Sequence, residues 1–549
     1  MKNIEKSGNN KTEVFAITLS DDNVDRGLSA PEEHSPTDHA YDFDSAIALT
    51  DFGRFNIMLY LAIMPCAWGC IFDTTSISYV LPYAECDLGM TLFHKGLLNA
   101  IIYAGMMSSA CVWGYWADTI GRRPLLLYGL ILDALCNFLI STSQSFYVLL
   151  TFKFFSGFIV NGPFAINMTF VAEYHSEKYR SRALLLIGLF NASAQFVLPC
   201  VAWIVIPQGW SFELLDGAFV YNSWRLFLFL SGLPCFIASL TVLYFPESPK
   251  FLMTQGKNEE ALKVFRWMYS LNTGNPPEMF PVKVLRQEDF AKKLNDNKLR
   301  NPNFWQKTYN RLVQMSLLFR KPYFKSFMLI AVLQFGSILG LNTLRLWLPQ
   351  LFTVMENYQS MQSDPEVGSG TFCDAVNNMT SLSNNRVNDA NTSDICVPVP
   401  VPDAVYINSL IVSATSVILY LLSSVAINKI SRKILMMISF FFSSLGFFVF
   451  YLSPNSDVVL ALSALTVSFS NITTLTITSI LVELMPTSLR TLAISLVMMI
   501  GRLGAVSGNL VFPILLNLGC YVPFSTIGGY LALCLLIAIF IPKPSGILV

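Results

Sequence analysis

Long apolar segments alternate with short polar connections from residue 56 to residue 541. Each segment has the length, about 20 residues, and the near absence of charge that a helix needs to cross a bilayer core about 30 Å thick. The pattern therefore predicts an all-α membrane protein. The twelve expected membrane-spanning helices are 56–82, 96–117, 124–142, 146–172, 183–206, 223–245, 324–352, 404–427, 433–453, 458–484, 491–517 and 520–541.

Composition supports the same class. Of the 549 residues, 53% are hydrophobic and 13% are charged, against about 45–50% and about 25% in soluble domains. This excludes an ordinary soluble enzyme. Lys+Arg and Asp+Glu both number 36, so no basic surface for nucleic acid is indicated. The 11 cysteines include no CxxC pair beside a second Cys or His pair, so neither a metal nor a cofactor is expected.

Basic residues between the segments set the orientation. They gather in the connections after spans 2, 4 and 8 and in the stretch 246–323. The positive-inside rule makes that side cytoplasmic. With an even number of spans, both termini are cytoplasmic. The opposite side carries a long connection, 353–403, with seven acids and one basic residue, Arg386.

These features divide the chain into five regions. The tail has low hydrophobicity and many acids, so we expect it to be disordered. It is either a segment that binds a cytoplasmic partner or is phosphorylated, or a plain solvated tail. It shows no basic segment followed by an apolar one, so no cleaved signal peptide is expected. The regions are an acidic tail 1–55, a six-helix bundle 56–245, a cytoplasmic linker domain 246–323, a second bundle 324–541 containing the outer loop 353–403, and a cytoplasmic terminus 542–549.

A repeat relates the two bundles. Asp118 after span 2 and Asn428 after span 8 are 310 residues apart. After span 4, Glu173 is followed seven residues on by Arg180. After span 10, Glu483 is followed by Arg490 at the same spacing and the same offset of 310. Two independent signatures at one offset predict two six-helix halves in the same orientation, as in transporters built from parallel repeats.

The cytoplasmic signatures predict a latch between the halves. Glycine permits close approach of helices, Asp118 can accept hydrogen bonds near a helix N-terminus, and the arginines supply partners for acids. Such pairs can break and reform as the halves rock. The alternative is a basic anchor with no gating role. The predicted gating residues are Gly114, Asp118, Gly121, Arg122, Arg123, Glu173, Arg180, Glu247, Glu483 and Arg490.

Three sequence features resemble a known family. Gly-x-x-x-Asp-x-x-Gly-Arg-Arg at 114–123 resembles the loop motif of the major facilitator superfamily. Pro-Glu-Ser-Pro-Lys at 246–250 is similar to a motif of its sugar-porter-related branches. The run 95–118 and the glycosylatable outer loop resemble the synaptic vesicle glycoprotein 2 group. The resemblance implies a major facilitator fold, with spans 1, 4, 7 and 10 lining a central cavity.

Ionisable residues inside spans are candidates for function because they are costly in a membrane. Asp73, Lys153 and Arg345 are the substrate-cavity candidates, with Trp68 and Trp347 as rings that stack on a solute or only pack. Asp133 and Arg502 are interpreted first as structural hydrogen-bonding groups. All four histidines lie in the tail or the connections. If transport is coupled to protons, the proton is therefore expected on Asp73.

Asp73 and Arg345 occupy near-equivalent positions in the repeat. Subtracting roughly 37 extra loop residues from 310 gives about 273 for spans 1 and 7, and the two residues are 272 apart. We expect them to pair across the cavity when the outer side closes, with Lys153 as the alternative partner of Asp73. The competing interpretation is that Arg345 only extends to the outer interface.

The outer loop carries modification signals. Asn378 and Asn391 each begin an Asn-x-Ser/Thr sequon in a polar stretch, so both are expected to be glycosylated. Cys373 and Cys396 are expected to form a disulfide on this oxidising side, the alternative being two free thiols.

The leading functional hypothesis is a secondary transporter of a small polar solute, either a sugar or an organic ion, in a vesicle membrane or the plasma membrane. The alternative is a non-transporting membrane glycoprotein that acts as a binding or trafficking partner. An enzyme is not expected, because the sequence holds no His cluster, phosphate-binding Gly loop or Ser-His-Asp arrangement on one membrane face.

Overall fold

The computed structural model describes residues 40–214, 219–286, 317–361, 371–378, 380, 401–426 and 429–542. These residues all belong to one compact unit, Ala40–Val549.

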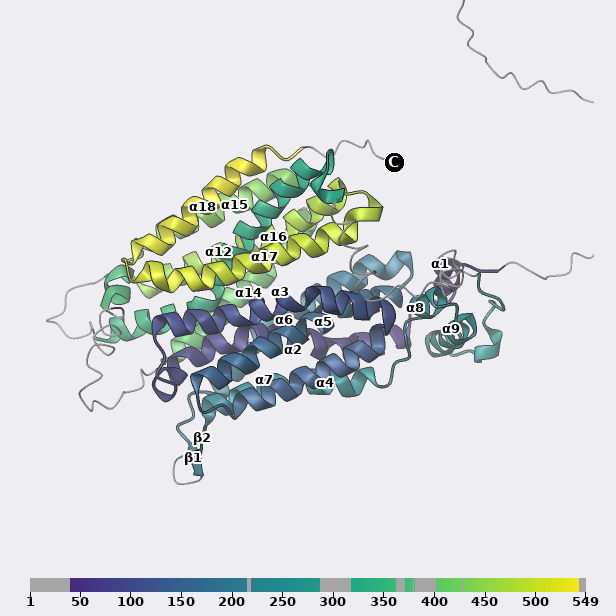
Figure 1. Ribbon diagram of the computed structural model, residues 1–549, viewed down its shortest axis with the longest axis horizontal. Helices are drawn as coiled ribbons and strands as arrows, with labels where there is room; N and C mark the ends of the chain where they lie inside the picture. Colours follow the sequence, from purple (N-terminus) through teal and green to yellow (C-terminus); the bar gives the residue numbers. More distant parts are fainter. Residues whose placement is uncertain are drawn as a thin grey trace, which may run out of the picture. The chain divides into compact units, whose positions relative to one another are not determined.

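Within the described residues, twelve long helices correspond to the twelve predicted spans (Figure 1). Eleven of the helices in the described residues are long and apolar enough to cross a membrane. The other long helix, α3, contains polar residues such as Lys95 and Asn99 but packs against α5 and α17 within the bundle. The twelve are α2 (Arg54–Asp87), α3 (Leu92–Thr119), α4 (Arg122–Ser141), α5 (Phe146–Glu173), α6 (Glu177–Val205), α7 (Ser223–Val242), α12 (Tyr323–Met361), α14 (Asp403–Ala426), α15 (Arg432–Phe450), α16 (Ser456–Leu484), α17 (Thr487–Leu516) and α18 (Tyr521–Ile539).

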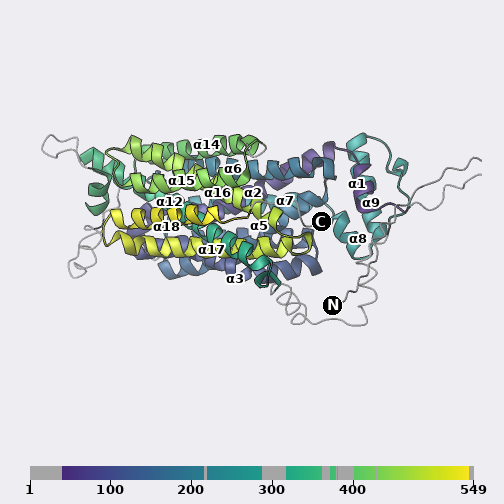
Figure 2. The ribbon, with the colours of Figure 1, turned by 90° about the horizontal axis from the view of Figure 1, so that it is seen from above.

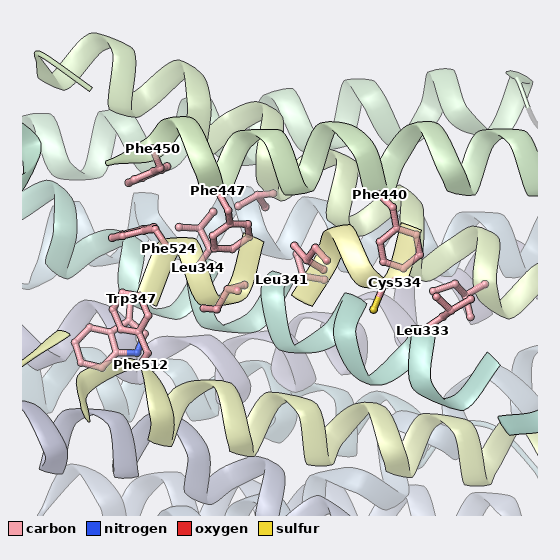
Figure 3. Close-up of a cluster of buried hydrophobic side chains, with 14 of the residues drawn as sticks. Leu333, Leu341, Leu344, Trp347, Phe440, Phe447, Phe450, Phe512, Phe524 and Cys534 are labelled. Atoms are coloured by element: carbon pink, nitrogen blue, oxygen red, sulfur yellow. The ribbon is translucent and has the colours of Figure 1, made fainter. Parts of the chain in front are cut away.

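The helices form two halves. The first half, α2 to α7, and the second half, α12 to α18, each have their own apolar core. The core of the second half is rich in phenylalanine, including Phe440, Phe447 and Phe524 (Figure 3). The halves meet through α3 with α17, α6 with α14 and α2 with α12.

The predicted repeat is confirmed by the helix boundaries. Helices α4 and α15 begin at Arg122 and Arg432, and α5 and α16 begin at Phe146 and Ser456, so both pairs differ by 310. Even the N-caps correspond, because Ser145 and Asn455 each accept a hydrogen bond from the backbone three residues on. These side chains satisfy N–H groups that a helix start leaves unpaired.

The two ends of the bundle differ in their connections. We call the end with the connections after α3, α5, α14 and α16 the basic end, because Arg122, Arg180 and Arg432 lie there. The end with the connections after α2, α4, α6, α12, α15 and α17 is the loop end. It includes the small hairpin of β1 (Ser211–Leu214) and β2 (Phe219–Asn222).

Short helices cap the first half at the basic end (Figure 2). They are α1 (Phe43–Ala48), α8 (Pro249–Thr254), α9 (Asn258–Thr273) and η1 (Pro277–Met279), while η2 (Leu317–Phe319) precedes α12. Helix α1 lies inside the predicted tail 1–55, so that boundary is corrected: residues 40–55 are folded. The reason is an apolar face, since Phe43 and Ile47 are buried in the same core cluster as Phe265 of α9.

The outer loop 353–403 also needs correction. Helix α12 continues to Met361, and 372–378 is helical. Phe372 packs its ring on Phe524 of α18 and thereby holds Cys373 beside the start of that helix, where it forms a disulfide with Cys520. The predicted Cys373–Cys396 pair is therefore wrong. Cys396 and Asn391 lie outside the described residues, and Asn378 is exposed.

Candidate functional site

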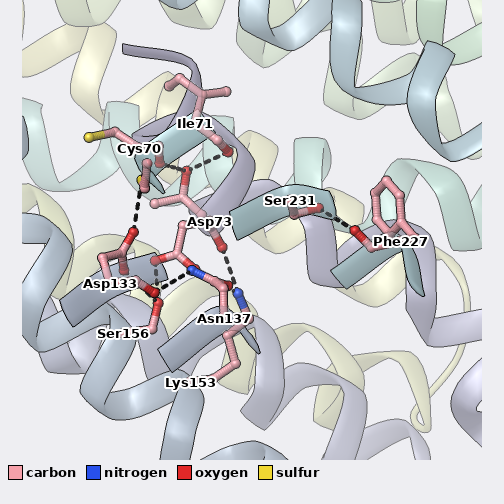
Figure 4. Close-up of polar contacts among 11 residues, drawn as sticks. Cys70, Ile71, Asp73, Asp133, Asn137, Lys153, Ser156, Phe227 and Ser231 are labelled. Atoms are coloured by element: carbon pink, nitrogen blue, oxygen red, sulfur yellow. Dashed lines mark hydrogen bonds and ion pairs between the residues drawn. The ribbon is translucent and has the colours of Figure 1, made fainter. Parts of the chain in front are cut away.

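A cluster of buried polar groups lies inside the first half (Figure 4). Lys153 on α5 donates to the Asp73 carboxylate on α2 with an Nζ–Oδ1 distance of 2.8 Å, and to the Asp73 carbonyl at 3.0 Å. Ser156, one turn further along α5, contacts Oδ2 of Asp73 and lies 3.2 Å from Oδ1 of Asp133 on α4. Cys235 on α7 lies 3.0 Å from Oδ2 of Asp133. We call these five residues the first-half cluster.

Both contacts of Ser156 can be hydrogen bonds at once only if one carboxyl group of the cluster is protonated. The hydroxyl of Ser156 has one hydrogen, so it can donate to only one of the two carboxyl groups. It makes its shorter contact with Asp73. The contact with Asp133 is then a hydrogen bond only if Asp133 is protonated and donates to Ser156. If Asp133 is protonated, the remaining charges of Asp73 and Lys153 cancel. Such neutrality is favoured because these three side chains are at most 1% exposed and a net charge is costly when buried.

The predicted pair of Asp73 and Arg345 is absent in this conformation. Asp73 binds its alternative partner, Lys153, because α2 and α5 belong to the same half and pack together. Arg345 on α12 instead donates to the Asn342 side chain at 2.8 Å and to the Tyr103 hydroxyl at 3.2 Å. Instead of the pair that the repeat suggested, Asp73 pairs with Lys153 inside the first half, and Arg345 contacts Tyr103 of the other half.

The two tryptophans differ in their surroundings. Trp347 is completely buried and packs on Phe512, with ring centroids 5.0 Å apart (Figure 3). It belongs to the core of the second half, so its assignment to the cavity is corrected. Trp68 is partly exposed, donates to the Ser193 hydroxyl at 3.0 Å and stacks on Phe72.

At the basic end, Glu247 holds the start of α4. Its carboxylate accepts hydrogen bonds from the backbone N–H groups of Arg122 at 3.1 Å and Arg123 at 3.2 Å. Gly121 has a φ of 111°, and a Cβ there would lie 2.3 Å from Oε2 of Glu247. The position thus requires glycine. Burial raises the pKa of Glu247, although these backbone donors oppose the shift.

Two ion pairs at the basic end repeat each other. Arg122 pairs with Glu173 at 3.2 Å. Arg432 pairs with Glu483, and both members are 310 residues further along. Each pair joins two helices of one half. The motif residues therefore brace the halves internally in this conformation.

The other predicted gating residues are dispersed. Arg180 pairs with Asp44 in the first turn of α1 at 3.2 Å, and the guanidinium of Arg123 donates to the Leu243 carbonyl. Gly114 lies within α3. The Nε of Arg490 is buried without a hydrogen-bond partner. The Asp118 side chain lies outside the described part of the structure.

The described hydrogen bonds between side chains of the two halves lie from the middle of the helices to the loop end. Besides the contact of Tyr103 with the second half, Lys95 donates to Gln350 at 3.3 Å while pairing with Glu85 of its own half at 2.7 Å. Trp203 donates to Asp403 at 3.0 Å. These contacts join the halves at the loop end.

Sequence reasoning missed several of these residues. It did not assign Ser156, Glu85 or Lys95 to the site, and it gave Asp133 only a structural role. Ser156 lies three residues after Lys153, on the same helix face, and that spacing was the available signal. The pairing of Lys95 with Glu85 across a helix connection had no comparable signal.

A family model described as "Major Facilitator Superfamily" matches residues 63–370 and 402–547. Human synaptic vesicle glycoprotein 2B is 25% identical over 338 residues, covering 58% of this chain and 49% of that protein. Human synaptic vesicle glycoprotein 2A is 30% identical over 257 residues, covering 46% of this chain and 34% of that protein. The chain thus matches about half or less of the length of these curated relatives.

Solved structures show the same fold. The xylose transporter XylE from E. coli, in a partially occluded inward open conformation, matches with a TM-score of 0.60 and 15% identity, covering 89% of this chain and 100% of that one. Its inward open conformation matches with a TM-score of 0.61, also at 15% identity, and covers 89% of this chain and 96% of that one.

Proposed function

The chain belongs to the major facilitator superfamily, whose family model covers well over half of it, and from this premise we propose that it moves a small polar solute by alternating access. Membership makes it an integral, multi-pass membrane protein of a transporter family rather than an enzyme. Within that family it is a distant relative of the synaptic vesicle glycoproteins 2. We place it in a vesicle membrane or the plasma membrane, with the basic end in the cytoplasm.

The distribution of contacts between the halves is the observation that carries the proposal. Described hydrogen bonds join the halves from the middle to the loop end, whereas the ion pairs of Arg122 and Arg432 stay within their halves. Two rigid repeats joined at one end are the arrangement that rocking requires. In this conformation a solute would reach the interface from the basic end.

Cross-linking the halves at the loop end tests whether transport requires that end to open. Trp203 and Asp403 are both exposed and lie on different halves. With cysteines at both positions, Trp203→Cys and Asp403→Cys, a flexible bismaleimide should abolish solute flux into proteoliposomes, because the loop end can no longer open. Each single variant, treated in the same way, is the control and should keep its flux. Undiminished flux in the fully cross-linked protein would contradict alternating access.

The same assay addresses the non-transporting alternative. A panel of sugars, organic cations and organic anions should include at least one solute that the protein carries. If none crosses, and deletion of residues 1–39 or of the outer loop nevertheless abolishes binding to a cellular partner, the protein is a partner glycoprotein.

We also propose that transport is coupled to protons through the first-half cluster. The hydrogen-bond counting at Ser156 supports this, since it leaves one proton on the Asp73 and Asp133 carboxyl groups. A structure of similar fold is described as a D-xylose-proton symporter. An imposed pH gradient should drive accumulation in the wild type but not in Asp73→Asn. Ser443→Ala, in the second half, is the control and should retain coupling. Accumulation driven by the pH gradient in Asp73→Asn would refute proton coupling through the first-half cluster.

A further inference from the structure

Two arginines of the second half converge on one helix of the first half. Arg345 on α12 donates to the hydroxyl of Tyr103 at 3.2 Å, and Arg502 on α17 donates to the carbonyl of Met106 at 3.5 Å. Tyr103 and Met106 are three residues apart on α3, so they lie on the same face, about 4.5 Å apart along the helix axis. Both guanidinium groups therefore point at one place between the halves.

Neither arginine forms an ion pair with an acid among the described residues. The other cations buried in the helix bundle do have such partners. Lys153 pairs with Asp73, Lys95 with Glu85 and Arg225 with Asp87. Arg345 and Arg502 are thus the cations near the middle of the helices that lack an acid partner among the described residues.

Most donors of the two guanidinium groups are also unused. A guanidinium has five N–H groups. Arg345 uses one nitrogen for Tyr103 and Asn342, and its Nε is buried without a partner. Arg502 makes one long contact. Both side chains remain partly exposed, so a ligand between the halves can reach them.

The surroundings are apolar and lie near the middle of the helices. Buried hydrophobic residues contributed by both halves, including Ile102, Val160 and Leu346, form one cluster with Tyr103 and Met106. Arg502 is near the midpoint of α17, a helix of 30 residues. Two uncompensated cations in such a place are costly unless an anion neutralises them. Transporters of this architecture bind their solutes at this depth.

We infer that Arg345 and Arg502 form the binding site for the acidic group of an organic anion. A guanidinium matches the two oxygens of a carboxylate, phosphate or sulfate in its fork geometry. The Tyr103 hydroxyl donates to the Asn342 side-chain oxygen at 2.9 Å, and both oxygens accept from Arg345, so these two residues hold its guanidinium in place. The inference rests on the proposed function and narrows its solute class to organic anions, in preference to sugars or organic cations.

Thermal unfolding of the purified full chain in an uncharged detergent tests the site. The anionic probes are benzoate, succinate and phenyl phosphate, each against a neutral counterpart: benzamide, succinamide and phenol. D-Xylose and tetraethylammonium represent the other solute classes. At least one anion should raise the Tm by several degrees while its neutral counterpart does not. Stabilisation by a neutral or cationic probe but by none of the anions overturns the inference.

Variants locate the binding. Arg345→Gln and Arg502→Gln should each lower the affinity for the stabilising anion by about tenfold or more, because each substitution removes charged hydrogen bonds. Arg345→Lys and Arg502→Lys keep the charge but lose the fork, so they should fall between wild type and the Gln variants. Arg54→Gln changes an exposed arginine at the start of α2 and should bind as wild type does. Undiminished binding in both Gln variants refutes the site.

Flux separates this inference from the proposed function. Anion binding that depends on both arginines, without flux of any solute, would leave the site intact and refute transport. Flux of D-xylose that is unaffected by both Gln variants would support transport and refute the anion site.

Discussion

The two halves share a backbone repeat but carry different chemistry. Counting 310 residues on from the first-half cluster, Asp133, Lys153 and Ser156 correspond to Ser443, Ser463 and Thr466. The second half thus replaces buried charges with hydroxyl groups. Ser443 bonds to Ser470 at 3.1 Å, and Ser463 bonds back to the helix at the Val459 carbonyl.

At the interface between the halves, it is the second half that carries the charge. Arg502 corresponds to Ala192 of the first half at the same offset. The acids of the cluster and the unpaired arginines therefore lie in different halves. This difference shows that repetition fixes where helices begin and pack, while single positions decide which half carries the buried acids and which carries the arginines without an acid among the described residues.

The basic end shows a similar asymmetry. Gly121 and Ser431 are equivalent N-caps of α4 and α15, but Gly121 has a positive φ and lies against Glu247. Ser431 has an ordinary φ of −55° and makes no side-chain capping bond. The start of α4 is thus the more constrained of the two.

The largest expected effect comes from removing the cluster's cation. Lys153→Met leaves the Asp73 carboxylate buried and unpaired, so it should destabilise the protein by about 3–5 kcal/mol, measured by unfolding in detergent. Ser463→Ala at the equivalent position should cost about 1 kcal/mol. The double variant Asp73→Asn with Lys153→Met should recover most of the loss. Equal effects at positions 153 and 463 would remove the proposed asymmetry.

A smaller effect is expected at the equivalent N-caps. Gly121→Ala forces a Cβ into a conformation that L residues rarely adopt and against Glu247, so it should cost about 1–3 kcal/mol. Ser431→Ala should stay within about 0.5 kcal/mol. Thermal unfolding of the two variants, side by side, measures the difference. Similar losses at both positions would show that Glu247 does not constrain α4.

The repeated ion pairs sharpen the comparison further. The Arg122–Glu173 side chains are 19% and 12% exposed, against 36% and 32% for Arg432–Glu483. Both coupling energies should be at most about 1 kcal/mol, with the first pair stronger because solvent screens it less. Double-mutant cycles with Arg→Gln and Glu→Gln in each pair give the two values. A larger coupling for the second pair would reverse the predicted order.

The smallest expected effect is a change in the pH dependence of stability that His175 causes. His175 lies between α5 and α6, with Nδ1 2.8 Å from the Val171 carbonyl, so Nε2 accepts a hydrogen bond from Tyr60 at 2.7 Å. Burial lowers the pKa of His175 from its usual 6.5. Below pH 6.5 the unfolded chain binds a proton that the folded one does not, so stability should fall as pH drops toward the lowered pKa.

His175→Met gives the first half the residue of its repeat partner, Met485, and should flatten this pH dependence. Unfolding measured between pH 5 and 8 tests the change. An unaltered pH profile in His175→Met would show that another group titrates.

Much of the fold was predictable because lipid imposes a simple rule. Predicted spans such as 146–172 and 458–484 differ by one or two residues from α5 (Phe146–Glu173) and α16 (Ser456–Leu484). A helix that crosses the bilayer core tolerates few polar side chains over about 20 residues, so the apolar composition of each segment locates its helix. Helix α1 was missed because six residues with one apolar face are stable only where a neighbouring core receives them.

The site was only partly predictable. The sequence selected Asp73, Lys153 and Arg345 as costly charges inside spans, and each is placed where a polar partner is required. It paired Asp73 with the wrong residue first, and it assigned Trp347 to the cavity, because the repeat gives the depth of a residue but not the direction of its side chain.

The sequence by itself determined the helical class, the twelve spans, the repeat of 310 residues and the family. The first three follow from hydropathy and spacing, which act along the chain, and the family from the resemblance of the motifs at 114–123 and 246–250. The tertiary structure alone decided that Asp73 pairs with Lys153 and that Cys373 bonds to Cys520 across 147 residues. It also decided that Arg345 and Arg502 meet at α3 without an acid from the part of the chain that the structure describes. These depend on which helix faces touch, and a contact between distant segments is fixed by packing in three dimensions rather than by local pattern.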